Sequence, residues 1–422
     1  MLAEDAAPER FGPAPPREGC RVTPLIEAAD MFPALENLVL KAERSVWLSF
    51  RVFDPDTRLR SDESQALGLA DWSALIAHVV RRGVEIRILL ADFEPVLADY
   101  LHAGSWHSYR RIRAILETLE AHERDRLQLI VIQHEGEVGW ALRQVLRPLL
   151  RHRTRKLVGK LLRRGRHEDG GLETRPGLWQ HLAWDEDKPT GWKAAPPPRL
   201  WPATYHQKFV VVDGTCTIIG GLDLDERRWD DRRHHQRANE TWHDISALLE
   251  GPVVADAARH FAELWNRELP RYRSTVAEWT DGCGQELMLD PLSEAAPAVE
   301  PLPPKGEATV QLARTLSRHD SRPFAFGPRI CIRELKAAHR SLILSARRLL
   351  YIEAQFFRSA AAAEQLPPQA PPETMDLAGW RDIARFNGSA EPEDRKGFVV
   401  PYQLGRARRF ARPYWFIPDD LV

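Results

Sequence analysis

The sequence is short of cysteine, of long apolar runs and of net charge. Its 422 residues contain only Cys20, Cys216, Cys283 and Cys331, which are scattered without metal-ligand spacing. This pattern argues against a disulfide framework or a cysteine zinc site and favours a reducing compartment. The proline-rich N-terminus has no apolar core of a secretory signal, and about eighteen consecutive apolar residues occur nowhere. We therefore expect a soluble, cytoplasmic protein without a membrane-spanning helix, and attachment to a membrane surface stays open.

Opposite charges nearly cancel over the chain, with 59 Lys and Arg against 60 Asp and Glu, so bulk charge indicates no partner. The exception is Arg143–Arg166, where leucines alternate with cations and no acidic residue occurs. A helix there, kinked at Pro148, would gather leucines on one face: Leu146, Leu149, Leu150, Leu157 and Leu161. Two interpretations stay open, contact with an anionic membrane surface and a solvated helix whose apolar face joins the core. We expect no nucleic acid partner, because no aromatic stacking pattern or binding fold is present.

The apolar pattern predicts strands that alternate with helices, typical of an α/β fold in which helices flank both faces of a mixed β-sheet. Strands are predicted at 45–50, 84–90, 127–132, 209–213, 216–219, 310–313 and 349–357. Helices are predicted at 31–42, 72–82, 105–121, 253–266 and 330–339, and residues 182–203 are predicted to form a proline-punctuated loop.

These elements predict one complete domain and part of a second. A flexible N-terminus would span residues 1–22, the first domain 23–280, and a Pro-, Ala- and Glu-rich linker 281–306. Residues 307–357 repeat the order of the first elements and would begin the second domain, which hints at a duplication. Residues 358–422 carry few periodic apolar runs and are predicted to be a divergent, disordered tail.

One motif carries chemistry, the pattern H-x-K-x4-D-x6-G-G from His206 to Gly221. His206 and Lys208 are two apart on an extended segment, so their side chains project to the same side. A potential nucleophile then lies beside a cation, the pair that a phosphoryl group needs. Imidazole titrates near neutrality and can attack phosphorus without a metal, so we expect neither metal nor cofactor.

Four segments together resemble the phospholipase D superfamily, and in particular its phosphatidylcholine-type members. The first is the motif itself, and the second is Gly220–Leu224 with Arg228-Trp229-Asp230. The third is Thr241–Ile245, followed by Gly251-Pro252, His260-Phe261 and Trp265-Asn266. The fourth is Tyr351–Phe357, in which Ala354 replaces the usual Asn. Nuclease-like members carry G-S-x-x-N where this chain has Gly220–Leu224, which lowers the odds of a nuclease.

The resemblance implies hydrolysis of phosphatidylcholine to phosphatidic acid and choline through a phosphohistidine on His206. Lys208 would hold phosphate oxygens, and Asp244 would orient the histidine from behind. Asp213 completes the motif, where we expect a structural role. The resemblance also implies substrate contacts by four residues, with a buried hydrogen-bonded pair as the alternative for the last two: Gly220, Gly221, Glu353 and Gln355.

The family's second H-x-K motif, whose histidine protonates the leaving alcohol, does not occur in the 422 residues. We therefore hypothesise a truncated or frame-altered phospholipase D, and three interpretations compete. The chain is active as a longer product or as a homodimer, it is a non-catalytic protein that binds phosphate or membranes, or it is a phosphatidyltransferase resembling cardiolipin synthase.

Overall fold

The computed structural model describes residues 14–164, 171–186, 188–193, 199–236, 241–281, 283, 286–287, 292–296 and 302–345. Its helices are α1 (Glu27–Leu40), α2 (Asp62–Ala66), α3 (Trp72–Arg81), α4 (Asp99–Glu117), α5 (Ala121–Arg124), α6 (Trp140–Arg164), α7 (Val253–Thr280) and α8 (Glu334–Ser345). Short 3-10 helices are η1 (Gly171–Thr174), η2 (Pro176–His181) and η3 (Glu226–Arg228). The strands are β1 (Arg17–Ile26), β2 (Ser45–Phe50), β3 (Glu85–Ala91), β4 (Leu127–Ile132), β5 (Leu182–Asp185), β6 (Lys188–Trp192), β7 (Phe209–Val212), β8 (Cys216–Gly220), β9 (Ile245–Glu250), β10 (Ala308–Val310), β11 (Thr315–Arg318) and β12 (Arg329–Arg333).

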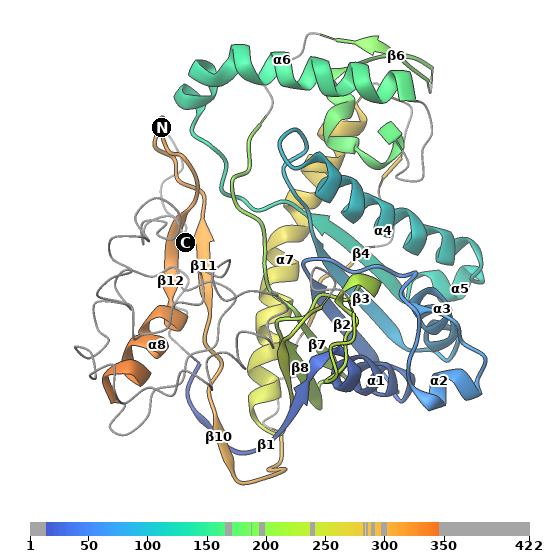
Figure 1. Ribbon diagram of the computed structural model, residues 1–422, viewed down its shortest axis with the longest axis vertical. Coiled ribbons are helices and arrows are strands. Elements are labelled where there is room, and N and C mark those ends of the chain that lie inside the picture. The colour runs from blue at the N-terminus through green and yellow to red at the C-terminus, as the bar shows by residue number, and fades with distance from the viewer. Residues whose placement is uncertain are drawn as a thin grey trace.

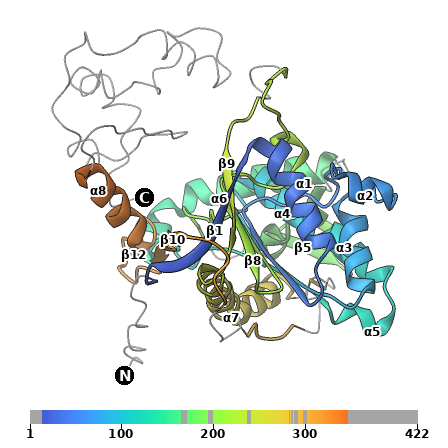
Figure 2. The same cartoon turned by 90° about the horizontal axis from the view of Figure 1, so that it is seen from below.

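An eight-stranded mixed sheet organises the molecule, in the order β10-β1-β9-β8-β7-β2-β3-β4. Strands β2, β3 and β4 run parallel, whereas the other neighbouring pairs are antiparallel. Helices α1 and α3 pack on one face and the long helix α7 on the other (Figures 1 and 2). The predicted mixed α/β fold with helices on both faces is therefore confirmed.

Burial on both faces explains why the central strands were predictable. In β2, Val46, Leu48 and Phe50 point to one face, and Trp47 points to the other and stacks on Phe261 of α7 with ring centroids 5.1 Å apart. A strand covered on both sides is a continuous apolar run, as the sequence has here. The predicted buried stripe of α7 is confirmed at all of its positions: Val254, Ala257, Ala258, Phe261, Leu264 and Trp265.

The structure corrects several boundaries. Residues 17–22 form the first part of β1 rather than a flexible terminus, and β10 pairs with β1 and so extends the first sheet. Part of the predicted loop 182–203 forms the hairpin β5–β6, and residues 330–333 are strand instead of helix. Helix α7 runs through Pro270 to Thr280, because its apolar spacing continues at Leu269, Tyr272, Val276 and Trp279.

The described part of the predicted linker is packed on the core. Asn266 of α7 exchanges two hydrogen bonds with the backbone of Ala295, at 2.9 and 2.7 Å, and the indole of Trp265 donates to the carbonyl of Ser293 at 2.9 Å. Leu287, Leu292 and Ala295 are buried there. The described part of this segment therefore packs against α7, rather than forming an unpacked linker. The predicted strand 349–357 and tail 358–422 lie outside the described residues.

Candidate active site

The ends of four strands bring the motif residues together. Ser49 near the end of β2 faces Phe209 at the start of β7, and Phe209 faces Ile219 of β8. Residues just before β7 therefore lie beside those that follow β2 and those that end β8. Asp244 immediately precedes β9, whose Ser246 faces Gly220. His206, Lys208 and Asp244 thus share one end of the sheet.

His206 and Lys208 are in direct contact. The Lys208 Nζ lies 3.2 Å from Nδ1 of His206 and donates to the carbonyl of His206 at 3.1 Å. Lys208 is 6% exposed, whereas the side chain of His206 is open to solvent. The predicted juxtaposition of imidazole and cation is present in the structure, with the imidazole on the accessible side.

Asp223 is 2% exposed, and its carboxylate lies close to three cationic side chains. Its carboxylate lies 3.7 Å from Lys208 Nζ, 3.3 Å from Arg51 Nη1 and 4.0 Å from Arg228 Nη2. It also accepts the backbone N–H of Val52 at 3.0 Å. Asp225 also lies 3.9 Å from Arg228, so carboxylates accompany the three cations, and a phosphate would have to compete with these carboxylates for Lys208, Arg51 and Arg228.

This environment keeps His206 neutral. Partial desolvation, followed by the positive charges of Lys208 and Arg51, lowers the pKa of His206 to about 4. Burial also lowers the pKa of Lys208, with Arg51 and Arg228 acting in the same direction and Asp223 opposing them. At neutral pH the imidazole is therefore unprotonated, as a nucleophile must be.

Both neighbours of His206 are tied to α7. The Tyr205 hydroxyl donates to Glu268 at 2.7 Å, and Gln207 Oε1 lies 2.8 Å from Nε2 of His260. Burial lowers the pKa of His260 to about 4, so its neutral ring donates Nε2–H to the Gln207 oxygen. These contacts fix the backbone on each side of His206 and give His260 a structural role.

Asp244 lies in this group but does not hydrogen-bond His206 among the described residues. Its Oδ1 accepts the backbone N–H of Ile245 at 2.8 Å, and burial raises its pKa despite the charge of Lys208. A β-carbon on Gly221 would collide with the Asp244 carboxylate, and one on Gly220 would collide with Ser246. The space that these glycines leave is filled by protein groups, so the sequence argument that it receives phosphate is not supported.

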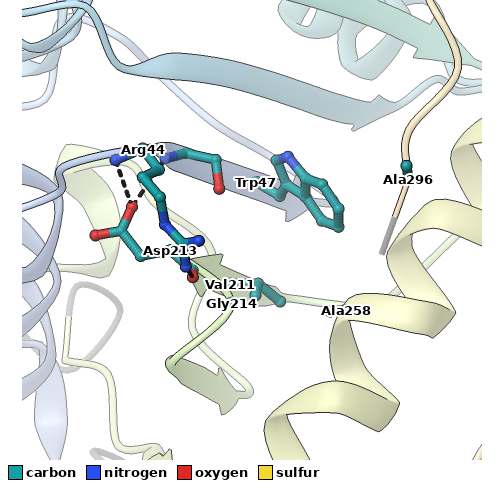
Figure 3. A pocket seen from close by; sticks show the side chains of 8 residues that line it. Arg44, Trp47, Val211, Asp213, Gly214, Ala258 and Ala296 are labelled. Atoms are coloured by element: carbon teal, nitrogen blue, oxygen red, sulfur yellow. Dashed lines mark hydrogen bonds between the residues drawn. The ribbon is translucent and has the colours of Figure 1, made fainter. Parts of the chain in front are cut away.

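Asp213 lies at the opposite end of β7, about 16 Å from Lys208 along the extended chain. Its carboxylate accepts three backbone N–H groups, those of Glu43 at 2.9 Å, Arg44 at 2.7 Å and Ser45 at 2.8 Å. Figure 3 shows it beside Arg44, at a pocket of about 270 Å³ between β2 and α7. Asp213 therefore fastens β7 to the start of β2, and it does not touch His206 or Lys208.

Sequence reasoning missed Arg51 as a site residue, and it treated Asp223 and Arg228 only as part of a resemblance. A signal was present for Arg51, because it directly follows the buried strand β2, and ligands of α/β sheets bind near such carboxyl ends. Nothing local marks Asp223 as the carboxylate around which the cations gather. Glu353 and Gln355 lie outside the described residues.

The chain is similar in sequence to phospholipase D proteins. It is 26% identical to phospholipase D alpha 3 of Arabidopsis thaliana over 207 residues, covering 36% of this chain and 24% of that protein. It is 24% identical to phospholipase D1 of Saccharomyces cerevisiae over 198 residues, covering 36% of this chain and 11% of that protein. The matched segments thus span a quarter or less of these relatives. No protein-family model matches the chain.

Among solved structures, one match is Nuc from Salmonella typhimurium, described as a phospholipase D family member. It shares 9% identity with a TM-score of 0.29, and the match covers 58% of this chain and 95% of that one. The sequence matches support a distant relationship to the phospholipase D superfamily.

Proposed function

We propose that this chain is a phospholipase D-like phosphodiesterase that acts on the headgroup phosphodiester of glycerophospholipids, with phosphatidylcholine as the reference substrate. The observation that carries the proposal is the neutral, accessible imidazole of His206 held 3.2 Å from the Lys208 ammonium. Arg51 and Arg228 extend the positive surface on which phosphate oxygens would rest. Neutralising those oxygens lowers the barrier to attack by a neutral nucleophile.

The contact between Lys208 and His206 has a consequence for the first step. While Nδ1 accepts a hydrogen bond from Lys208, the single ring proton is on Nε2, and no lone pair is available on Nε2 for attack. A bound phosphate would draw the Lys208 ammonium to its own oxygens and free Nδ1. The ring proton can then move from Nε2 to Nδ1, where a carboxylate would accept its hydrogen bond. The lone pair of Nε2 is then free to attack phosphorus. Asp244 is the candidate acceptor, at the same end of the sheet.

In that step a nitrogen–phosphorus bond forms and the bond to the headgroup oxygen breaks. The departing choline oxygen needs a proton, and water must later cleave the phosphohistidine. No second H-x-K histidine occurs in the 422 residues. In this chain alone, a solvent water would give the departing choline oxygen its proton and become hydroxide, so we expect the covalent step to proceed slowly. A proton donor from a second copy would speed this step and the later hydrolysis, and so complete turnover.

The test is to incubate the chain with phosphatidylcholine vesicles and ethanol, and to measure two products. Mass spectrometry of the protein reports a phosphatidyl adduct on His206, and lipid chromatography reports phosphatidylethanol. We expect the adduct in the unmodified chain and in the control His319→Ala, whose histidine is exposed, and its loss in His206→Ala. An adduct or product that persists in His206→Ala would overturn the assignment.

A non-catalytic phosphate-binding protein is the second candidate, favoured by the single H-x-K motif. In that case neither adduct nor phosphatidylethanol forms, but the chain still binds short-chain phosphatidic acid, and Lys208→Ala abolishes this binding. Cardiolipin formed from added phosphatidylglycerol would instead indicate a phosphatidyltransferase.

We also propose that α6 contacts an anionic membrane. Its outward side carries Val145 and Leu149, which are 67% and 51% exposed, and continues into the exposed cations Lys156 and Lys160. Apolar residues beside cations suit the boundary between headgroups and acyl chains. Among the described residues, no helix combines the length and apolar character needed to cross a bilayer.

Cosedimentation with phosphatidylserine-containing vesicles tests the contact. The pair Lys156→Glu and Lys160→Glu should weaken binding by at least about tenfold, at roughly 1 kcal/mol for each charge near the surface. The charge-matched control Lys41→Glu and Lys305→Glu changes exposed lysines outside α6 and should bind as the unmodified chain does. Equal losses in the two variants would contradict a specific role for α6.

A further inference from the structure

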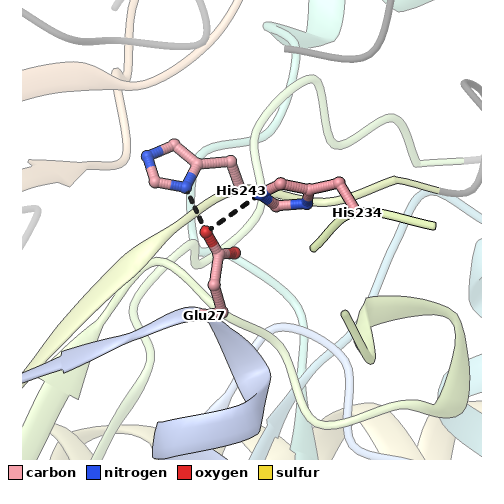
Figure 4. Close-up of side chains that lie close together, drawn as sticks. All are labelled: Glu27, His234 and His243. Atoms are coloured by element: carbon pink, nitrogen blue, oxygen red, sulfur yellow. Dashed lines mark hydrogen bonds and ion pairs between the residues drawn. The ribbon is translucent and has the colours of Figure 1, made fainter. Parts of the chain in front are cut away.

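Three side chains from distant parts of the sequence meet next to the candidate active site. Glu27 is the first residue of α1, His234 follows η3, and His243 immediately precedes Asp244. One ligand atom from each lies within 4.8 Å of the others. Figure 4 shows both imidazoles directed at the same oxygen of Glu27. Such convergence of two imidazoles and a carboxylate is a donor set that transition metals use.

The conformation and burial of Glu27 are both energetically unfavourable. Its side chain is fully buried, and its backbone φ is +65°, in the left-handed region that glutamate seldom adopts. Its Oε1 lies 2.5 Å from Nδ1 of His243, and its Oε2 has no hydrogen-bond partner within the described part of the chain. A buried carboxylate with an unsatisfied oxygen is unfavourable unless a positive group compensates it.

His234 is oriented by a second carboxylate. Its Nδ1 lies 2.8 Å from Asp230, which is 1% exposed and also accepts the N–H of Trp242 at 2.7 Å. Donation to Asp230 keeps the ring proton on Nδ1 and turns the Nε2 lone pair toward Glu27 Oε1, 3.4 Å away. Histidines that bind metals are fixed in the same way by a carboxylate on their other nitrogen.

We propose that Glu27, His234 and His243 form a binding site for one divalent transition metal of the zinc type. Ligands about 2.0–2.1 Å from a tetrahedral zinc lie about 3.3 Å from each other, close to the spacing of His234 and Glu27. The contact between His243 and Glu27 is shorter, at 2.5 Å, because a proton joins them, and a metal that replaced this proton would move the two atoms about 0.8 Å further apart. A water would complete the coordination.

The site connects α1 to the loop that carries Asp244. The backbone N–H of Glu27 donates to the carbonyl of Asp244 at 3.0 Å, so a metal between Glu27 and His243 would fasten this loop at two points. The metal therefore positions the wall of the candidate active site without touching His206. The proposal does not depend on the phospholipase activity, because metal binding is measured directly.

The experiment uses the full chain stripped with a chelator, dialysed, and titrated with ZnCl₂ while metal content and calorimetric binding are measured. We expect one Zn²⁺ per chain, a raised melting temperature, and a tetrahedral Co²⁺ absorption band when Co²⁺ replaces Zn²⁺. The variants Glu27→Gln and His234→Ala should each bind at least about tenfold more weakly. The control His122→Ala, which removes an exposed histidine, should bind normally.

The proposal is overturned if the unmodified chain takes up less than a tenth of an equivalent of Zn²⁺, or if the Co²⁺ spectrum shows only hexaaqua-like ions. It is equally overturned if the ligand variants and the control bind alike. Zinc uptake is measured on the unmodified chain, so this criterion decides the proposal even if a ligand variant fails to fold.

Discussion

At the scale of single residues, Gly221 leaves no room for a side chain, because the carboxylate of Asp244 occupies the place of a β-carbon. Alanine there must push the Asp244 carboxylate away. Because this carboxylate is the end of a side chain that can turn, we expect a cost at the lower end of the range for overpacking, about 1 kcal/mol of folding stability. Urea unfolding of Gly221→Ala measures this loss. The matched control is Gly104→Ala in α4, where open space surrounds the new methyl group and helix propensity favours alanine by up to about 1 kcal/mol. Equal effects at the two positions would contradict the close contact.

The variant Asp213→Ala distinguishes a structural role of this motif residue from a catalytic role. Its carboxylate accepts the N–H groups of Glu43, Arg44 and Ser45, so Asp213→Ala would leave these donors without their acceptor and cost about 1–3 kcal/mol. Because the site is at the other end of β7, the phosphatidyl adduct formed per folded molecule should not change. Unfolding and adduct formation are measured on the same sample, with Asp125→Ala, at an exposed position, as the control. Loss of adduct at full stability would show a chemical role.

At the scale of elements, the burial of neighbouring leucines shows which side of α6 faces the core. The leucines predicted to share one face are divided by the structure, since Leu150 is 2% exposed and Leu149 is 51% exposed. Leu150→Ala should therefore cost about 2–5 kcal/mol through the cavity it leaves, whereas Leu149→Ala should change stability by less than about 0.5 kcal/mol. Chemical denaturation of the two variants compares them directly. A larger loss for Leu149→Ala would mean that the helix is rotated.

Elements that are buried on both sides were predictable, and elements at the edges were not. Strands β2, β3, β4, β7 and β8 are apolar runs that the sequence alone reveals. Strand β1 is largely exposed along its length, with only Cys20 and Leu25 buried, so it has no such run. Its place in the sheet comes from pairing with β9 and β10, which lie far away in sequence. Local pattern cannot report such pairing.

The same limit applies to the candidate site. His206 and Lys208 were predicted because two positions on one extended segment fix their relative direction. Arg51 reaches Asp223 from 172 residues away, and Glu27 reaches His243 from 216 residues away. These contacts depend on the order of the strands in the sheet, which spacing along the chain does not contain. The motif thus predicted that His206 and Lys208 lie side by side, and the fold supplied the groups around them.

At the scale of the whole molecule, buried histidines make stability depend on pH. Burial lowers the pKa of three enclosed histidines, His134, His181 and His260, from 6.5 to about 4. The pKa of His206 is lowered in the same direction, but its ring is exposed to solvent, so its contribution to stability is screened and smaller. Between pH 4 and 6.5 each histidine is therefore protonated in the unfolded chain but not in the folded one. Glu94 opposes them, because burial raises its pKa from 4.5 to about 7 and the folded protein then holds a proton that the unfolded chain has lost. Burial also raises the pKa of Glu36, Asp54, Asp225 and Asp244, which oppose the histidines in the same way as Glu94. Among the described residues, the three enclosed histidines outweigh these carboxyls above pH 5, which leaves the unfolded chain with up to about two more bound protons.

We therefore expect the free energy of unfolding to fall on acidification, by up to about 2–3 kcal/mol for each pH unit below 6.5, since each net proton contributes about 1.4 kcal/mol. His181→Gln removes one of the three histidines and should about halve this slope, whereas the control His122→Gln, at an exposed position, should keep it. Urea unfolding at several pH values between 5 and 6.5 measures the slopes. Stability that rises on acidification would mean that Glu94 and other carboxyls dominate, and an unchanged slope in His181→Gln would mean that this histidine is protonated in the folded protein.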